Sequence, residues 1–107
     1  DIGIHMAEEK YNSSQGKFQE IEGPPVAKEL LKELNIPQNI KDRVLYLIGH
    51  HHSYNKIDGL DFQILVEADF LVNIFEDSIE RKSMENIRNN IFKTNSGISL
   101  LNKLYLY

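Results

Sequence analysis

Residues 60–75, LDFQILVEADFLVNIF, are the stretch that decides the fold. Eleven of these 16 residues are apolar and occupy nearly all sides of a helix, so we expect this helix to lie in the core. Asp69 lies inside it. An ionised carboxylate loses several kcal/mol of solvation when it is buried, so a buried Asp is normally paired, hydrogen-bonded or bound to a metal ion. Asp69 is therefore predicted to have such a partner.

Three consecutive histidines, His50, His51 and His52, precede Asp69 by fewer than 20 residues and are the candidate partners. They end a predicted helix over residues 38–51, whose apolar side chains share one face. A turn of 100° per residue places His51 on that face and His50 on the opposite side. Imidazole and carboxylate groups that converge between neighbouring helices form typical sites for divalent ions. The pattern thus predicts a metal ion that also neutralises Asp69.

The rest of the sequence predicts further helices and no strand. Residues 1–21 carry little periodicity and are expected to be mostly irregular. Further helices are expected over residues 24–35, which open with Pro24 and Pro25, over residues 83–93 and over residues 98–104. No stretch alternates with period two for long enough to form a confident strand. We therefore predict an all-α fold, a compact bundle of about five helices in one domain over residues 1–107.

Composition and charge exclude several classes of protein. The net charge of −4 and the isoelectric point near 5.5 argue against a nucleic-acid or membrane-surface partner. The chain has no cysteine, which excludes disulfides and thiolate metal sites. No stretch reaches the roughly 18 apolar residues of a membrane helix, and no signal-peptide pattern is visible. A cytoplasmic location is the default, and the missing initial Met suggests a piece of a longer protein.

Each candidate residue also has a structural interpretation. The three histidines are compatible with a solvated helix end, where imidazolium groups interact favourably with the helix dipole. Asp69 is compatible with a structural acid bonded to a Tyr hydroxyl or to Arg43. Glu22 is compatible with an acid favoured at a helix start. Their joint occurrence, at the end of one helix and inside the next, favours a functional site.

Four short motifs resemble, in this order, the HD-domain metal-dependent phosphohydrolases. They are Asp1-Ile2-Gly3, Glu22-Gly23-Pro24-Pro25-Val26-Ala27, Leu47-Ile48-Gly49-His50-His51-His52 and Glu67-Ala68-Asp69. That family is all-helical and is named for a His-Asp pair, usually followed by Ile-Gly. An earlier His precedes the pair and a distant Asp follows it. The resemblance covers about residues 1–77, and it implies the same fold.

The resemblance also implies roles for individual residues. Asp1 and Asp69 match the Asp of the pair and the distal Asp, which are both metal ligands in the family. His51 and His52 match downstream histidines that bind a second metal or the substrate phosphate in some members. Glu22 stands where some binuclear members have a His before Gly-Pro, and its carboxylate is a potential ligand. The implied cofactor is a divalent ion such as Fe, Mn, Zn, Ni or Mg.

The chain departs from the family pattern at its start. Two histidine ligands of the family lie upstream of Asp1, so we expect a domain that lacks its N-terminal helices and is inactive by itself. Ile4 stands where some members have a phosphate-binding Lys, and three nearby side chains are candidates to replace it: His5, Lys10 and Lys17. A second explanation of Gly3-Ile4-His5-Met6 is a cloning scar, in which case Asp1 has no role.

The sequence therefore predicts hydrolysis of a small phosphorylated or nucleotide-like substrate by a metal-activated water. Asp1, His51 and Asp69 are the predicted metal ligands, and Glu22, His51 and His52 are the predicted catalytic residues. A non-catalytic, nucleotide-binding or regulatory HD-like domain is the main alternative. A structural helical module with surface histidines is another. No nucleic-acid or membrane partner is expected, and a homo-oligomer is left open.

Overall fold

The computed structural model describes residues 1–107 throughout and contains helices but no strands. The all-α prediction is confirmed, although six α-helices form instead of about five. The chain divides into two compact units, Asp1–Ser53 and Tyr54–Tyr107, which are described separately below. A single HD-like domain over the whole chain therefore stays a prediction. None of the helices combines the length and the apolar character that a membrane crossing requires.

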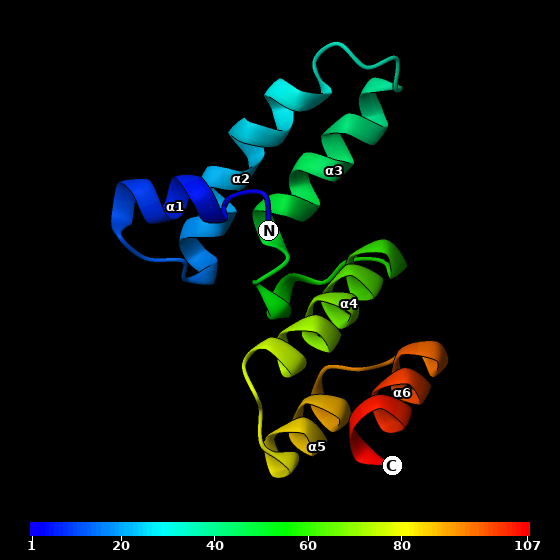
Figure 1. Ribbon diagram of the computed structural model, residues 1–107. Coiled ribbons are helices and arrows are strands. Elements are labelled where there is room, and N and C mark those ends of the chain that lie inside the picture. Colours follow the sequence, from blue (N-terminus) through cyan, green and yellow to red (C-terminus); the bar gives the residue numbers. More distant parts are fainter. The chain divides into compact units, whose positions relative to one another are not determined.

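The first unit contains α1 (Ile4–Tyr11), α2 (Gly16–Leu31) and α3 (Gln38–His50). α2 and α3 lie side by side as an antiparallel pair, and α1 crosses α2 (Figure 1). The expectation of irregular structure over residues 1–21 is wrong, because α1 and the first turns of α2 fill this range. Asn12 ends α1 in the left-handed conformation with a φ of 52°.

α2 begins well before the position that the prolines suggested. Pro24 and Pro25 lie inside the helix, whereas the sequence pattern placed them at its start. A proline in a helix interior removes a backbone hydrogen bond, so its local preference is for the first turn. Here packing overrides that preference, because α2 is held against both α1 and α3. Gly23 and Ala27 on α2 are buried, as is Ala7 on α1.

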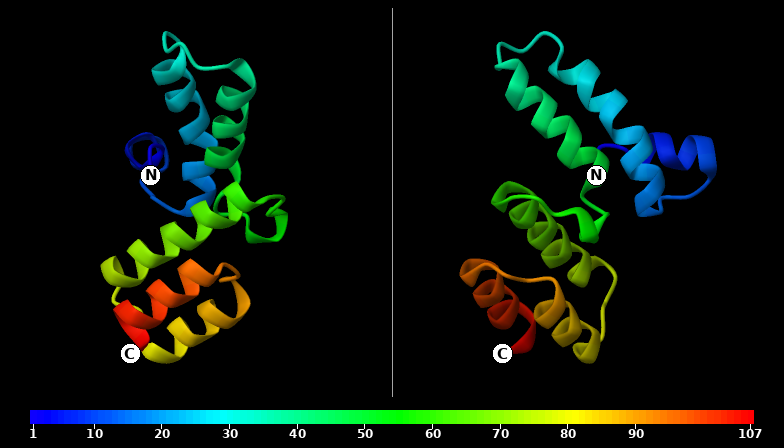
Figure 2. Two further views of the ribbon diagram at one scale, coloured as in Figure 1. Left: turned by 90° about the vertical axis from the view of Figure 1, so that its right-hand side faces the viewer. Right: turned by 180° about the vertical axis from the view of Figure 1, so that it is seen from behind.

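The second unit contains the 3₁₀ turn η1 (Tyr54–Lys56), α4 (Leu60–Glu76), α5 (Arg81–Asn90), α6 (Asn95–Leu101) and the π-helical turn η2 (Asn102–Leu106). α4, α5 and α6 gather into a small bundle (Figure 2). Its core consists of four buried side chains: Ile74, Phe92, Leu101 and Leu106. Thr94 caps α6, because its hydroxyl accepts a hydrogen bond from the Gly97 backbone N–H at 3.0 Å.

α4 is buried on one side only, although the sequence predicted a helix surrounded by the core. Phe62, Val66 and Ile74 are buried. Leu60 and Phe75, by contrast, are 68% and 76% exposed. α5 and α6 both lie on the same side of α4, so the opposite side has no helix of this unit against it (Figure 2). An apolar pattern that covers most of a helix does not reveal which face is buried.

Candidate metal centre

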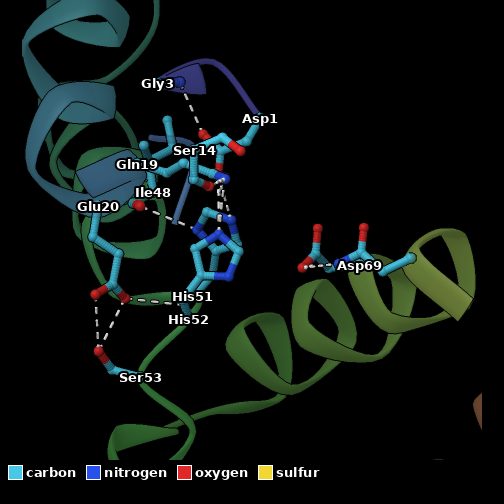
Figure 3. A network of polar contacts seen from close by, with 11 residues as sticks. Asp1, Gly3, Ser14, Gln19, Glu20, Ile48, His51, His52, Ser53 and Asp69 are labelled. Carbon is cyan, nitrogen blue, oxygen red and sulfur yellow. Dashed lines mark hydrogen bonds and ion pairs between the residues drawn. The ribbon is translucent and has the colours of Figure 1, made fainter. Parts of the chain in front are cut away.

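The first unit brings a carboxylate and two imidazoles together. Asp1 immediately precedes the start of α1, His51 is the C-terminal cap of α3, and His52 follows it. One potential ligand atom from each of the three side chains lies within 4.8 Å of the others. The three side chains converge on one point from two distant segments of the sequence (Figure 3).

A hydrogen bond within the N-terminal turn orients Asp1. Its Oδ1 atom accepts a hydrogen bond from the Gly3 backbone N–H at 2.9 Å. The other carboxylate oxygen, Oδ2, is thereby directed at the histidines, 2.7 Å from His51 Nε2 and 3.2 Å from His52 Nε2. The Asp1 side chain is only 7% exposed, although the residue as a whole is exposed through its terminal backbone. The carboxylate therefore depends on these partners rather than on bulk water.

Close packing of glycines brings Asp1 to this position. A Cβ atom on Gly3 would lie 2.5 Å from the Gln19 backbone oxygen and 2.8 Å from the Gly23 nitrogen. A Cβ atom on Gly23 would lie 2.6 Å from Ile48 Cγ2. The backbone entering α1 can therefore approach α2, and α2 can approach α3, only because these two residues have no side chain.

His51 is the inward-pointing histidine, as the sequence predicted. It is 6% exposed, and its Nδ1 atom lies 3.0 Å from the Ile48 backbone oxygen. Since a carbonyl oxygen only accepts, Nδ1 must carry a hydrogen there. The predicted outward position of His50 is not fully realised, because it is half-buried, with its ring stacked on Tyr46 at 4.1 Å.

The contact between His51 Nε2 and Asp1 Oδ2 then requires a positive charge. With the hydrogen of a neutral ring on Nδ1, Nε2 presents a lone pair, and so does the carboxylate oxygen 2.7 Å away. A proton or a metal ion between the two atoms removes the repulsion between these lone pairs. A metal ion can therefore take the place of a proton at this contact.

Two residues of α2, which sequence reasoning missed, hold the second histidine. The Gln19 side-chain oxygen lies 3.1 Å from His52 Nε2. Glu20 accepts hydrogen bonds from the His52 backbone N–H at 3.0 Å and from the Ser53 hydroxyl. Gln19 would have been found had the helix been predicted from Gly16, because Gln19, Gly23 and Ala27 then share a buried face at four-residue spacing.

Glu22, a predicted catalytic residue, is not one of the three converging residues. Its carboxylate is buried and accepts a hydrogen bond from the Tyr11 hydroxyl at 2.9 Å. Lys10 Nζ lies 2.8 Å from its other oxygen. The hydrogen bonds from Lys10 and Tyr11 lower the pKa of Glu22, and the carboxylate in turn raises the pKa of both partners. Glu22 thus ties α1 to α2, and its catalytic role stays a prediction.

Asp69, the other predicted ligand, belongs to the second unit. It is half-buried on α4, and its Oδ2 atom accepts a hydrogen bond from the Asn73 side chain at 3.1 Å. Its role as a metal ligand stays a prediction. The buried acid of α4 is Glu67, which is 2% exposed. The sequence predicted a buried Asp69, which is only half-buried, because an apolar helix with two nearby acids does not indicate which of them faces inward.

The residues that converge in the first unit fit a divalent metal ion. Two imidazole nitrogens and a carboxylate oxygen are ligands that Zn, Fe, Mn and Ni accept in proteins. The hydrogen bond from His51 Nδ1–H to a backbone carbonyl is the usual support that turns Nε2 toward a metal.

In comparisons with known proteins, no family model, no curated protein and no solved structure matches the chain.

Proposed function

We propose that the intact protein is a metal-dependent phosphohydrolase that acts on a small phosphorylated or nucleotide-like compound. The observation that carries the proposal is the convergence of the Asp1 carboxylate with the imidazoles of His51 and His52. The resemblance of four motifs to HD-domain phosphohydrolases supports the reaction class. In that family two further histidine ligands precede the matching Asp, so the proposal includes ligands beyond the three residues that converge here.

Asp1 and His51 would hold the ion through Oδ2 and Nε2, and the resemblance adds Asp69 as a further ligand. When bound, a divalent ion supplies Lewis-acid polarisation of a phosphoryl oxygen and a lowered pKa of a bound water. His51 is kept in place by its bond to the Ile48 carbonyl. His52 would bind a phosphate oxygen or a second ion, as in the family. Glu22 would orient water or bind a metal, if it leaves the contacts that it makes with Lys10 and Tyr11.

Metal analysis and a phosphatase assay test the proposal. The protein, expressed with any residues that naturally precede Asp1, is purified, assayed for Fe, Mn, Zn and Ni, and tested against 4-nitrophenyl phosphate and nucleotides. We expect about one or two ions per chain and hydrolysis that a chelator abolishes. Asp1→Asn and His51→Gln should lose both properties and remain helical by circular dichroism.

A matched control distinguishes loss of the site from general damage. Asp42→Asn changes an exposed aspartate on α3, which accepts a hydrogen bond from Gln38, and should leave the metal content and the hydrolysis unchanged. Hydrolysis that persists in metal-free protein would contradict the proposal. Metal-free protein that binds nucleotides without hydrolysing them would instead support the regulatory alternative.

A further inference from the structure

The two histidines beside Asp1 have different polar surroundings. His51 presents Nε2 to Asp1 and turns Nδ1 toward the Ile48 carbonyl. His52 also presents Nε2 to Asp1, at 3.2 Å, but the same nitrogen lies 3.1 Å from the side-chain oxygen of Gln19. The distances alone admit both rings as metal ligands. Their hydrogen-bond partners differ, however, because only His52 Nε2 also faces the side-chain oxygen of Gln19.

The orientation of the Gln19 amide is set by its other contact. The amide nitrogen donates a hydrogen bond to the Ser14 backbone oxygen. A carbonyl oxygen accepts only, so the nitrogen must face Ser14, and the amide oxygen must face His52. Gln19 is 9% exposed, which limits the water available to replace either contact. His52 Nε2 therefore faces two oxygen acceptors, and a hydrogen on that nitrogen satisfies both.

Gly16 keeps the His52 ring in this position. A Cβ atom on Gly16 would lie 2.8 Å from His52 Cγ and 2.9 Å from its Cβ, so the start of α2 packs closely against the imidazole. On the backbone side, Glu20 accepts the His52 N–H at 3.0 Å. The first turn of α2 thus fixes both the place of the ring and the acceptor that Nε2 meets.

We infer that Gln19 is a positioning residue that assigns different roles to the two imidazoles. It keeps the hydrogen on His52 Nε2, so His52 faces the site as a hydrogen-bond donor to an anionic oxygen. His51, with its hydrogen on Nδ1, offers the Nε2 lone pair to the metal ion. The inference rests on the proposed function and decides between the two roles that were open for His52: it contacts the phosphate, and it does not bind a metal ion.

Ring ¹⁵N NMR at a single pH tests this assignment, with ¹⁵N-histidine in the full chain and Zn²⁺ as the probe. In metal-free wild-type protein, His52 should show a hydrogen attached to Nε2, and His51 should show one attached to Nδ1. Added Zn²⁺ should shift His51 Nε2 and leave the hydrogen on His52 Nε2. Loss of that hydrogen when Zn²⁺ binds would overturn the inference.

The Gln19→Met variant removes the acceptor and nearly preserves the size of the side chain. The second acceptor, Asp1 Oδ2, is occupied once Zn²⁺ binds, so we expect His52 Nε2 to lose its hydrogen and bind the metal in the Zn²⁺-loaded variant. This raises Zn²⁺ affinity by roughly 10-fold, a change of the size usual for residues behind a ligand. Gln38→Met is the control, because Gln38 is an exposed glutamine at the start of α3 that bonds Asp42. Wild-type spectra and affinity in Gln19→Met would also overturn the inference.

Two further outcomes are informative. Gln19→Glu retains an oxygen acceptor for His52 Nε2 but loses the donor to the Ser14 oxygen. It should preserve the hydrogen on His52 Nε2, which separates the acceptor role from the other contact of the amide. If Gln19→Met does not fold, this variant and the wild-type spectra decide. If Zn²⁺ shifts neither ring, the proposed metal site fails. The tautomer of His52 in metal-free wild-type protein then still tests the inference, because a hydrogen on Nδ1 instead of Nε2 would overturn it.

Discussion

The two units of the protein each bury a carboxylate, and they satisfy it in different ways. Glu67 in the second unit is surrounded by donors. Its oxygens accept hydrogen bonds from the Gln63 side chain at 2.6 Å, from the Thr94 hydroxyl at 2.6 Å, and from the backbone N–H groups of Lys93 and Thr94. Asp1 in the first unit receives one backbone hydrogen bond and otherwise faces two imidazole nitrogens.

The difference separates a structural acid from a candidate functional one. Every partner of Glu67 is a fixed donor, so the charge is satisfied without any ligand, and the carboxylate anchors the start of α6 to α4. A Cβ atom on Gly97 would collide with Glu67, which shows how tightly α6 closes over it. The partners of Asp1 can exchange a proton for a metal ion. Burial alone does not identify a site, whereas the chemical type of the partners does.

The largest expected effect is loss of stability on removing the structural acid. Glu67→Ala leaves two backbone N–H groups and the Thr94 hydroxyl without their acceptor. We expect the free energy of unfolding to fall by roughly 3–5 kcal/mol, measured by urea denaturation. Glu76→Ala, an exposed acid at the end of the same helix, is the control and should change little. A small effect of Glu67→Ala would remove the basis for calling this acid structural.

The second effect concerns the acid of the first unit and should appear in binding more than in folding. Zn²⁺ should bind the wild-type chain between His51 Nε2 and Asp1 Oδ2, in place of their direct contact. Isothermal titration calorimetry measures the affinity. Asp1→Asn should weaken Zn²⁺ binding by roughly 100-fold or more, since losses beyond the ligand shell already reach that range. Zinc that binds equally well to Asp1→Asn would refute the site.

The inward position of His51 could be predicted because its angle continues the apolar face of α3. The helices over residues 38–50 and 60–76 could likewise be predicted, because each carries a long apolar pattern. The partner of His51 in the first unit could not be predicted from periodicity. It depends on α1, which has a weak pattern, and on an approach between Gly3 and Gly23 that only the packed helices reveal.

Two other errors have a shared physical origin in tertiary packing. Pro24 and Pro25 favour a helix start locally, but the contacts of α2 with α1 and α3 outweigh this preference. In α4, apolar residues on nearly all sides leave no angular signal, so Glu67 and Asp69 are equally plausible buried acids until α5 and α6 select a face. Gln19 was missed for the same reason, because its role depends on where α2 begins.

The third effect tests whether close helix packing positions the functional acid. Gly23→Ala places a methyl group 2.6 Å from Ile48 Cγ2. We expect a loss of about 1–3 kcal/mol in stability from overpacking, and weaker Zn²⁺ binding, because the Ile48 carbonyl orients His51. Thermal unfolding and calorimetry measure the two effects.

Ile48→Leu in the same chain provides the matched test. Leucine has no methyl branch on Cβ, so the double variant regains the space that the alanine occupies. We expect recovery of both stability and Zn²⁺ affinity relative to Gly23→Ala. If the double variant is worse than the single one, the contact between Gly23 and Ile48 is not what limits the position of His51.

The smallest effect compares acid sensitivity within the first unit. The pKa of Glu22 is lowered from an ordinary value of 4.5 by hydrogen bonds from Lys10 and Tyr11. A carboxylate with a lowered pKa in the folded state stabilises the fold above its unfolded pKa, and this contribution is lost as the pH falls through the folded pKa. Wild-type stability should therefore decline below a pH of about 4.5.

Glu22→Gln should be less stable than the wild type near neutral pH but should lose less stability as the pH falls below that value. Urea denaturation at several pH values measures the free energy of unfolding. Glu29→Gln, at an exposed position of the same helix, should lose as much stability at acidic pH as the wild type does. If Glu22→Gln loses as much stability at acidic pH as the wild type, the contact of Glu22 with Lys10 and Tyr11 contributes nothing to folding. Glu22 would then be available for the catalytic role that its sequence position suggested.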